Sequence, residues 1–244
     1  MKKTLALSEE IIGYNNANLD SSIKRLERGN TFRNLSTVWI VPTRGVVRCK
    51  VISSWIGLAR PMNQSVVGPI FFEGDEVGVA YEKAFDLILN GPQFKDFKYI
   101  FTSEEDNILP SDTLLKLYES IEKGYDCVAG LYWTKSSSTD AVFSQPMIYG
   151  DPSVMPMNFV PQKPRPGELQ ACNGLGMGAN LWKIDSLRKK LKGLPRPWFK
   201  TIQEKDKAFT QDLYFFFRSA SYGFKCAVDN RVLVGHLADD GKVW

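Results

Sequence analysis

The chain has 244 residues, of which 43% are apolar and 24% charged, the composition of an ordinary globular protein. Its net charge of +4 allows an anionic substrate but is too small for a protein that coats nucleic acid. Only one histidine is present, His236, which excludes a zinc site built from several histidines. The length is that of one large α/β or all-β domain.

The cysteines and the start of the chain indicate where the protein works. The four cysteines are widely spaced without a C-x-x-C pair, which excludes a zinc ribbon and a thioredoxin motif and favours free thiols. The first apolar run ends at Ser8-Glu9-Glu10, too early for a signal peptide. No apolar run approaches the roughly 20 residues that span a membrane. We therefore expect a soluble, cytoplasmic protein.

Strand and helix patterns alternate through the first half of the chain, after an N-terminal extension (residues 1–36) with an amphipathic helix expected near Ser21–Arg28. This alternation predicts an α/β fold with a mixed, mostly parallel central sheet and flanking helices. The expected strands cover residues 38–41, 66–72, 98–101 and 128–133, and the expected helices cover residues 46–58, 76–89 and 111–123.

The middle of the chain, residues 134–168, is rich in Ser, Pro, Met and Gly. We expect a long irregular loop with a short β-ribbon at Pro146–Tyr149, and loops of this length in a compact domain are usually functional or disordered. Order returns with helices at 185–191 and 211–221. A strand pair is then expected over residues 225–234, turning at Asp229-Asn230.

An acidic cluster, Ser103-Glu104-Glu105-Asp106-Asn107, directly follows the third expected strand. In parallel α/β sheets, ligands bind beyond the carboxyl ends of the strands. Hard divalent cations prefer oxygen ligands, so the cluster is suited to a metal that neutralises a diphosphate. A solvated loop before the next helix is an equal alternative for the cluster alone.

Two further residues have a functional and a structural interpretation. Asp212 lies in the first turn of an expected helix, where an acid stabilises the helix dipole by about 0.3–1 kcal/mol; the alternative is a general base. His236 follows the last expected strand, where a lone histidine is more often structural than a ligand. As a ligand, its nitrogen would favour manganese over calcium.

A glycine run, Gly174–Ala179, formally matches the dinucleotide fingerprint G-x-G-x-x-A. That fingerprint needs a complete doubly wound sheet, and too little chain follows the run to build one. A tight turn that brings the backbone close to a ligand is the better interpretation.

The order of these motifs resembles the nucleotide-sugar glycosyltransferases of the GT-A fold, of the inverting family-2 kind. The matching segments are similar to that family's nucleotide-binding turn, D-x-D motif, glycine-rich segment, aromatic pair, E-D motif and closing histidine. In chain order they are Val41–Arg44, Tyr99–Pro110, Gly176–Leu181, Trp198-Phe199, Thr210–Phe215 and Gly235-His236.

The resemblance implies a set of site residues. Asp106 and His236 would hold Mn²⁺ or Mg²⁺, with Glu104 as a further ligand or a ribose contact, and Asp212 would be the catalytic base. The implied nucleotide-sugar-binding residues are Pro42, Thr43, Arg44, Glu73, Asp75, Glu104, Glu105, Gly176, Met177 and Gly178. The implied acceptor-binding residues are Trp133, Trp198, Phe199 and Gln211.

The chain departs from the family pattern at three places. Glu104 stands where the D-x-D motif begins, and Gln211 stands where the E-D pair has its first acid. The aspartate that usually contacts uracil has no clear counterpart, for which Glu73 and Asp75 are the candidates. The GT-A domain would cover residues 37–244, with residues 134–168 as the loop over the donor and acceptor.

The function implied is metal-dependent transfer of a sugar from a nucleotide-diphosphate sugar, expected to be a UDP-sugar, to an acceptor hydroxyl with inversion. The acceptor would be a glycan, a protein or a nucleic acid, including a modified base. A nucleotidyltransferase is one alternative, but it would need a Gly-rich basic loop where Thr43-Arg44-Gly45 is too short. A non-catalytic sugar- or nucleic-acid-binding module is the other. The oligomeric state is not predicted.

Overall fold

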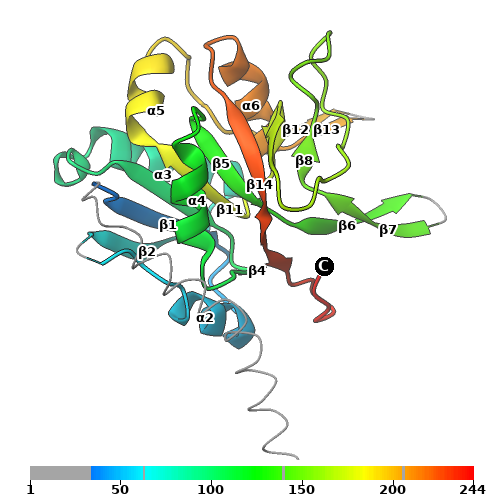
Figure 1. Ribbon diagram of the computed structural model, residues 1–244, viewed down its shortest axis with the longest axis horizontal. Coiled ribbons are helices and arrows are strands. Elements are labelled where there is room, and N and C mark those ends of the chain that lie inside the picture. The colour runs from blue at the N-terminus through cyan, green and yellow to red at the C-terminus, as the bar shows by residue number, and fades with distance from the viewer. Residues whose placement is uncertain (1–33, 63, 139–140, 205–206) are drawn as a thin grey trace, which may run out of the picture.

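A computed structural model describes residues 34–62, 64–138, 141–204 and 207–244 (Figure 1). The helix expected near Ser21–Arg28 lies outside these residues. The centre of the fold is a seven-stranded sheet. Its strands in spatial order are β2 (Val66–Glu73), β1 (Thr37–Thr43), β3 (Tyr99–Ser103), β11 (Ala179–Lys183), β5 (Cys127–Leu131), β14 (Cys226–Leu233) and β9 (Leu169–Cys172).

The sheet is mixed and mostly parallel. Strands β2, β1, β3, β5 and β14 run in one direction, because β11 lies antiparallel between β3 and β5 and links two parallel groups. The edge strand β9 is antiparallel to β14. This confirms the fold class predicted from the alternating pattern.

Helices cover both faces of the sheet, because alternate strand residues are apolar on each side. On one face lie α3 (Val77–Asn90), α5 (Ile184–Lys190) and α6 (Gln211–Ala220), whose apolar residues join one buried cluster. On the other face lie α2 (Cys49–Ile56) and α4 (Thr113–Ile121), which join a second cluster. A 3₁₀ turn, η1 (Pro92–Phe94), follows α3.

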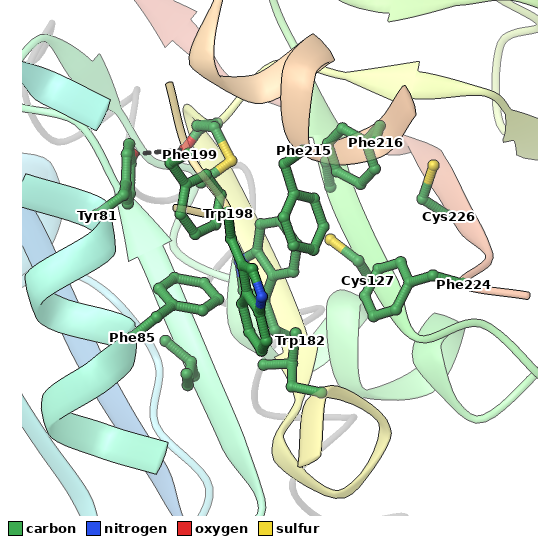
Figure 2. Close-up of a cluster of buried hydrophobic side chains, with 14 of the residues drawn as sticks. Tyr81, Phe85, Cys127, Trp182, Trp198, Phe199, Phe215, Phe216, Phe224 and Cys226 are labelled. Atoms are coloured by element: carbon green, nitrogen blue, oxygen red, sulfur yellow. Dashed lines mark hydrogen bonds between the residues drawn. The ribbon is translucent and has the colours of Figure 1, made fainter. Parts of the chain in front are cut away.

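Trp182 of β11 is the centre of the first cluster (Figure 2). Its ring meets Phe85 edge-on at 5.3 Å and stacks on Phe216 at 5.7 Å between ring centroids. Its indole N–H donates to Thr102 Oγ1 at 3.1 Å, so the buried polar atom is satisfied. Leu181, one residue earlier, points into the second cluster, and β11 therefore joins the two cores.

The prediction of an irregular stretch from Thr134 was wrong for its first part. Strands β6 (Trp133–Ser138) and β7 (Ala141–Pro146) form an antiparallel ribbon that extends away from the sheet (Figure 1). The ribbon is ordered by backbone hydrogen bonds between its two strands, and a Ser-rich composition gives no indication of such pairing. Strand β8 (Ile148–Tyr149), at the predicted short ribbon, pairs with β10 (Gly174–Leu175).

The strand pair expected around Asp229-Asn230 is instead one strand, β14. Its pairing with β5 shifts register between Asp229 and Leu233, so the polar residues form an irregularity within the strand. The Asp229 carboxylate accepts from Arg231 N at 3.0 Å and from Arg231 Nη2 at 2.8 Å, which satisfies the buried acid locally. An Asp-Asn pair therefore did not mark a turn here.

The remaining strands are short two-residue or three-residue pairs. Strand β12 (Ile202–Glu204) pairs with β13 (Lys207–Phe209), and β15 (Gly235–His236) pairs with β4 (Asn107–Ile108). All four cysteines are free thiols, as expected. In the part of the chain that the structure describes, no helix has both the length and the apolar character to cross a membrane.

Candidate functional site

Most of the predicted metal-binding and nucleotide-binding residues lie at one edge of the sheet. The parallel strands β1, β2, β3, β5 and β14 all end there, and the antiparallel β11 begins there. The turns that follow these strands therefore meet, which is the usual ligand position in such sheets. These turns bring together segments that are far apart in the chain, from Arg44 to His236.

Asp106 and His236 face each other at this edge. His236 Nε2 lies 3.2 Å from Asp106 Oδ2, and the side chains are 21% and 31% exposed. The contact is held by backbone pairing, because His236 is the register partner of Asn107 and Leu237 N donates to Asp106 O at 2.9 Å. The sequence places these two residues far apart, and the pairing of β15 with β4 joins them.

The Asp106–His236 pair fits a divalent cation. Two adjacent ligands of an octahedral ion, each bonded at about 2.1 Å, lie about 3 Å apart, close to the separation found here. Asp106 Oδ1 and His236 Nδ1 are buried and have no hydrogen-bond partner among the described residues. No group of three or more metal-binding side chains forms within the described residues, so substrate oxygens would complete the coordination.

Glu104 is half-buried beside this pair. The Tyr81 hydroxyl donates to Glu104 Oε1 at 3.3 Å, and Glu104 N donates to Asn107 Oδ1 at 3.1 Å. Burial, with the nearby charges of Asp106 and Asp212, raises the pKa of Glu104 to about 8. The negative charges of Asp106 and Asp212 thus act on Glu104, and a cation near these acids would relieve that repulsion.

Asp212 opens α6 and is only 4% exposed. Burial raises its pKa above the ordinary aspartate value, although hydrogen bonds from Thr210 and from Leu213 N partly offset this effect. The Leu213 N–H donates to Asp212 Oδ1 at 2.8 Å and fixes the carboxylate in the first turn. A fixed carboxylate with a raised pKa has the properties of a general base.

Glu105 ties the ends of β1 and β3 together. Its carboxylate accepts from Thr43 Oγ1 at 2.6 Å and from Arg44 N at 2.7 Å, and Arg44 Nε also donates to it. Burial alone would raise the pKa of Glu105, but these hydrogen bonds outweigh it and hold the pKa below its ordinary value. The Arg44 side chain stays 78% exposed at the edge.

The other predicted nucleotide-binding residues lie around this junction. Pro42 and Thr43 pair with Phe72 and Glu73 at the ends of β1 and β2. Asp75 lies in the following turn, where Lys83 Nζ donates to both of its carboxylate oxygens at 2.8 Å. Glu73 therefore lies directly beside the Thr43 turn, and Asp75 already has a cationic neighbour.

The glycine run packs tightly against Tyr132. A Cβ on Gly176 would lie 2.1 Å from Tyr132 Oη, and one on Gly178 would lie 2.8 Å from Tyr132 Cε1. Between them, Met177 O accepts from the Tyr81 hydroxyl at 3.4 Å. The Tyr132 ring in turn lies 6.0 Å from the His236 ring at an interplanar angle of 26°. The run thus shapes the wall behind the Asp106–His236 pair.

The four predicted acceptor-binding residues do not form one surface. Trp198 and Phe199 are 5% and 2% exposed, because their rings pack among Tyr81, Phe85 and Phe215 in the core (Figure 2). Trp133 begins the β6–β7 ribbon and is half-buried. Gln211 is at the start of α6, next to Asp212.

Sequence reasoning missed three residues at this edge: Tyr81, Tyr132 and Trp244. Tyr81 and Tyr132 lie inside regular elements or directly after one, where an aromatic residue indicates packing and not a site. Trp244 follows a polar turn far from any recognised motif. Only the pairing of its backbone with His236 reveals its place.

No protein-family model matches the chain, and no curated protein matches its sequence. Solved structures match in three dimensions. A197 from STIV has a TM-score of 0.54 and 20% identity, over 85% of this chain and 92% of that chain. GalNAc-T7, solved with UDP, GalNAc and Mn²⁺, has a TM-score of 0.54 and 12% identity, over 83% of this chain and 43% of that chain.

These likenesses, together with the sheet order and flanking helices, define the fold as GT-A, a Rossmann-like class. At identities this low they define the fold and nothing finer. The likeness to GalNAc-T7 covers less than half of that longer chain. The function of the present chain must therefore be argued from its own site.

Proposed function

We propose that the protein is a metal-dependent glycosyltransferase that moves a sugar from a nucleotide-diphosphate sugar, expected to be a UDP-sugar, to an acceptor hydroxyl with inversion. The observation that carries this proposal is the convergence of Asp106, His236 and Asp212 at the strand ends of a GT-A fold. GalNAc-T7 shares that fold and was solved with UDP and Mn²⁺, which supports a nucleotide sugar and a divalent metal here.

Asp106 and His236 would hold the metal, which when bound supplies Lewis-acid stabilisation to the departing diphosphate. Glu105, Thr43 and Arg44 form the turn against which the nucleoside would lie, with Glu73 beside it. The Gly176–Gly178 run keeps side chains out of the space next to Tyr132 and so shapes the donor pocket.

Asp212 would take the proton from the acceptor hydroxyl as its oxygen attacks the anomeric carbon. The attack comes from the face opposite the leaving diphosphate, so a single displacement inverts the anomeric configuration. A raised pKa strengthens Asp212 as a base compared with an exposed aspartate. Glu104 accepts from the Tyr81 hydroxyl and feels the charges of both Asp106 and Asp212, and it would contact the ribose or the sugar.

The acceptor is a glycan, a protein or a nucleic acid that offers a hydroxyl group. The β6–β7 ribbon, which begins with the half-buried Trp133, extends away from the sheet (Figure 1) and would contact the acceptor. Gln211, which precedes the base, would complete that side of the site.

The direct test is a donor screen. Purified protein is incubated with a panel of nucleotide sugars and Mn²⁺, and release of nucleoside diphosphate is measured with and without candidate acceptors. We expect release from one class of donor, loss of release with a chelator, and recovery on adding Mn²⁺. Full activity in the chelator would contradict the metal roles of Asp106 and His236. Pyrophosphate release from a nucleoside triphosphate and a sugar phosphate would instead identify a nucleotidyltransferase.

A further inference from the structure

The segment after β15 folds back and forms a ribbon with it. His236 N donates to Trp244 O at 3.0 Å, and Trp244 N donates to His236 O at 2.9 Å. Ala238 N donates to Lys242 O at 2.8 Å and continues the pairing. Directly opposed residues of an antiparallel pair project their side chains from one face. The side chains of His236 and Trp244 are therefore neighbours.

Strand β4 extends the ribbon on its other side, where Asn107 is the register partner of His236. Asn107, His236 and Trp244 thus form a row across three chain segments, which we call the nitrogen row. The opposite face of the ribbon carries Ile108 and Leu237, which are buried in the second apolar cluster. The nitrogen row is therefore on the face that is not needed to attach the ribbon to this core.

Each member of the nitrogen row has a side-chain nitrogen that is shielded from solvent. Asn107 Nδ2, His236 Nδ1 and Trp244 Nε1 have no hydrogen-bond partner in the described part of the chain. A buried donor without an acceptor costs about 1–3 kcal/mol. Three such nitrogens side by side therefore need an explanation, such as a ligand that accepts their hydrogen bonds.

Three tryptophans of the core differ from Trp244, because their indole N–H groups have acceptors. Trp39, Trp55 and Trp182 donate their N–H groups to Ser103 Oγ, Asn107 O and Thr102 Oγ1, at 2.8, 3.1 and 3.1 Å. The fold therefore provides acceptors for indoles that serve only in packing. The Trp244 N–H has no such acceptor, and it lies next to a proposed metal ligand.

The chemistry of the row indicates its ligand. A row of N–H groups needs a ligand with several acceptor oxygens, and the adjacent Asp106–His236 pair fits a divalent cation. Phosphate oxygens satisfy both requirements, because they accept hydrogen bonds and bind hard cations. Lys242 lies on the same face of the ribbon as Trp244 and adds a positive charge, with only a long 3.9 Å contact to Asp240.

Resting on the proposed function, we propose that Trp244 donates its indole N–H to a phosphate oxygen of the nucleotide-sugar donor, with Asn107 and His236 completing the row. Because the three nitrogens are shielded, we expect the ribbon to shift as the phosphate enters. Arg48 would limit that shift, since its Nη1 and Nη2 donate to Ala238 O and Asp239 O at 2.8 Å and hold the turn of the ribbon.

The test is calorimetric titration of pyrophosphate, with saturating Mn²⁺, into the whole protein and its Trp244→Phe variant. Phenylalanine keeps an aromatic ring, although a smaller one than the indole, and removes the N–H. Val243→Thr is the matched control, because Val243 pairs with Leu237 on the opposite face of the same ribbon and is 43% exposed, so that the new hydroxyl can be solvated. We expect Trp244→Phe to weaken pyrophosphate binding about tenfold or more, and Val243→Thr to leave it unchanged.

Mn²⁺ binding alone, followed by electron paramagnetic resonance, should be equal in all three proteins, because Trp244 does not contact the metal. Equal pyrophosphate affinity in Trp244→Phe and wild type would overturn the inference, as would an equal loss in Val243→Thr. If wild type binds pyrophosphate in a Trp244-dependent way but transfers no sugar from any donor, the proposed function fails alone. If wild type does not bind pyrophosphate, the inference fails whatever the result of the donor screen.

Discussion

At the scale of single residues, the site depends on how burial changes the protonation of its acids. Glu104 is half-buried and Asp212 is buried, and both have raised pKa values, whereas hydrogen bonds from Thr43 and Arg44 lower the pKa of Glu105. Neighbouring carboxyl groups with such different environments can take different roles. The best candidate for a base is Asp212, because its carboxylate is fixed by the Leu213 N–H.

We expect Asp212→Asn to lower kcat by a factor of about 10²–10⁴, because asparagine keeps the shape of the side chain but cannot accept a proton. Binding of UDP with Mn²⁺ should stay within about twofold of wild type. In wild type, kcat should fall as the pH drops through the pKa of Asp212, which burial raises, because only the ionised form acts as a base. The residual activity of Asp212→Asn should not show this fall of kcat at low pH. A variant with normal turnover would remove Asp212 from the mechanism.

The sequence could indicate site residues only where motifs follow one another in a recognisable order along the chain. Asp106, His236 and Asp212 were predicted because their motifs follow a family's order, and the structure brings Asp106 and His236 into contact. Trp198 and Phe199 were expected to bind the acceptor but lie in the core, since an aromatic pair looks the same in both settings. Trp244 could not be found, because its position depends on backbone pairing with His236.

At the scale of elements, the strands with apolar runs were predictable and the central β11 was not. Its sequence, Ala179–Lys183, is short and follows a glycine run, so local pattern favoured a turn. This segment becomes a strand because it pairs with β3 on one side and β5 on the other and buries Trp182. The β6–β7 ribbon was missed for a similar reason, since its Ser-rich residues have no apolar alternation.

The glycine run before β11 gives a prediction at this scale. We expect Gly176→Ala to destabilise the protein by about 1–3 kcal/mol, because the new Cβ would lie 2.1 Å from the hydroxyl of the buried Tyr132. Displacing Tyr132 would also disturb the ring of His236, so binding of UDP with Mn²⁺ should weaken. Urea unfolding and calorimetry measure the two effects.

Gly193→Ala is the matched control for this substitution. A Cβ on Gly193 would meet only Tyr222 Cε1, at an ordinary contact distance of 3.5 Å. Stability and ligand binding should therefore stay close to wild type in this variant. If Gly176→Ala behaves like Gly193→Ala, the packing between the glycine run and Tyr132 does not shape the site.

At the scale of the whole molecule, the proposed metal site would be incomplete without substrate. Asp106 and His236 would supply two ligands, and the described residues contain no group of three or more metal-binding side chains. Mn²⁺ should therefore bind weakly without a diphosphate, and each ligand should strengthen the binding of the other.

Thermal unfolding should show this coupling. With the Mn²⁺–UDP complex at about 100 times its dissociation constant, we expect a stabilisation of about 3 kcal/mol, or a rise in Tm of about 6–12 °C. Either ligand alone should give a much smaller rise. In Asp106→Asn the additional rise from the pair should disappear. An equal rise with Mn²⁺ alone would show that the protein completes the metal site by itself.

The pairing of β15 with β4 also determines when the site forms during folding. Asp106 and His236 come from opposite halves of the chain, so their contact closes a very long loop and depends on the assembled sheet between them. During synthesis Asp106 emerges long before the imidazole of His236, and the proposed pair cannot form until residues 235–236 dock. If the pair binds a metal as proposed, metal affinity would be acquired late and would distinguish a completed fold from a nearly completed one.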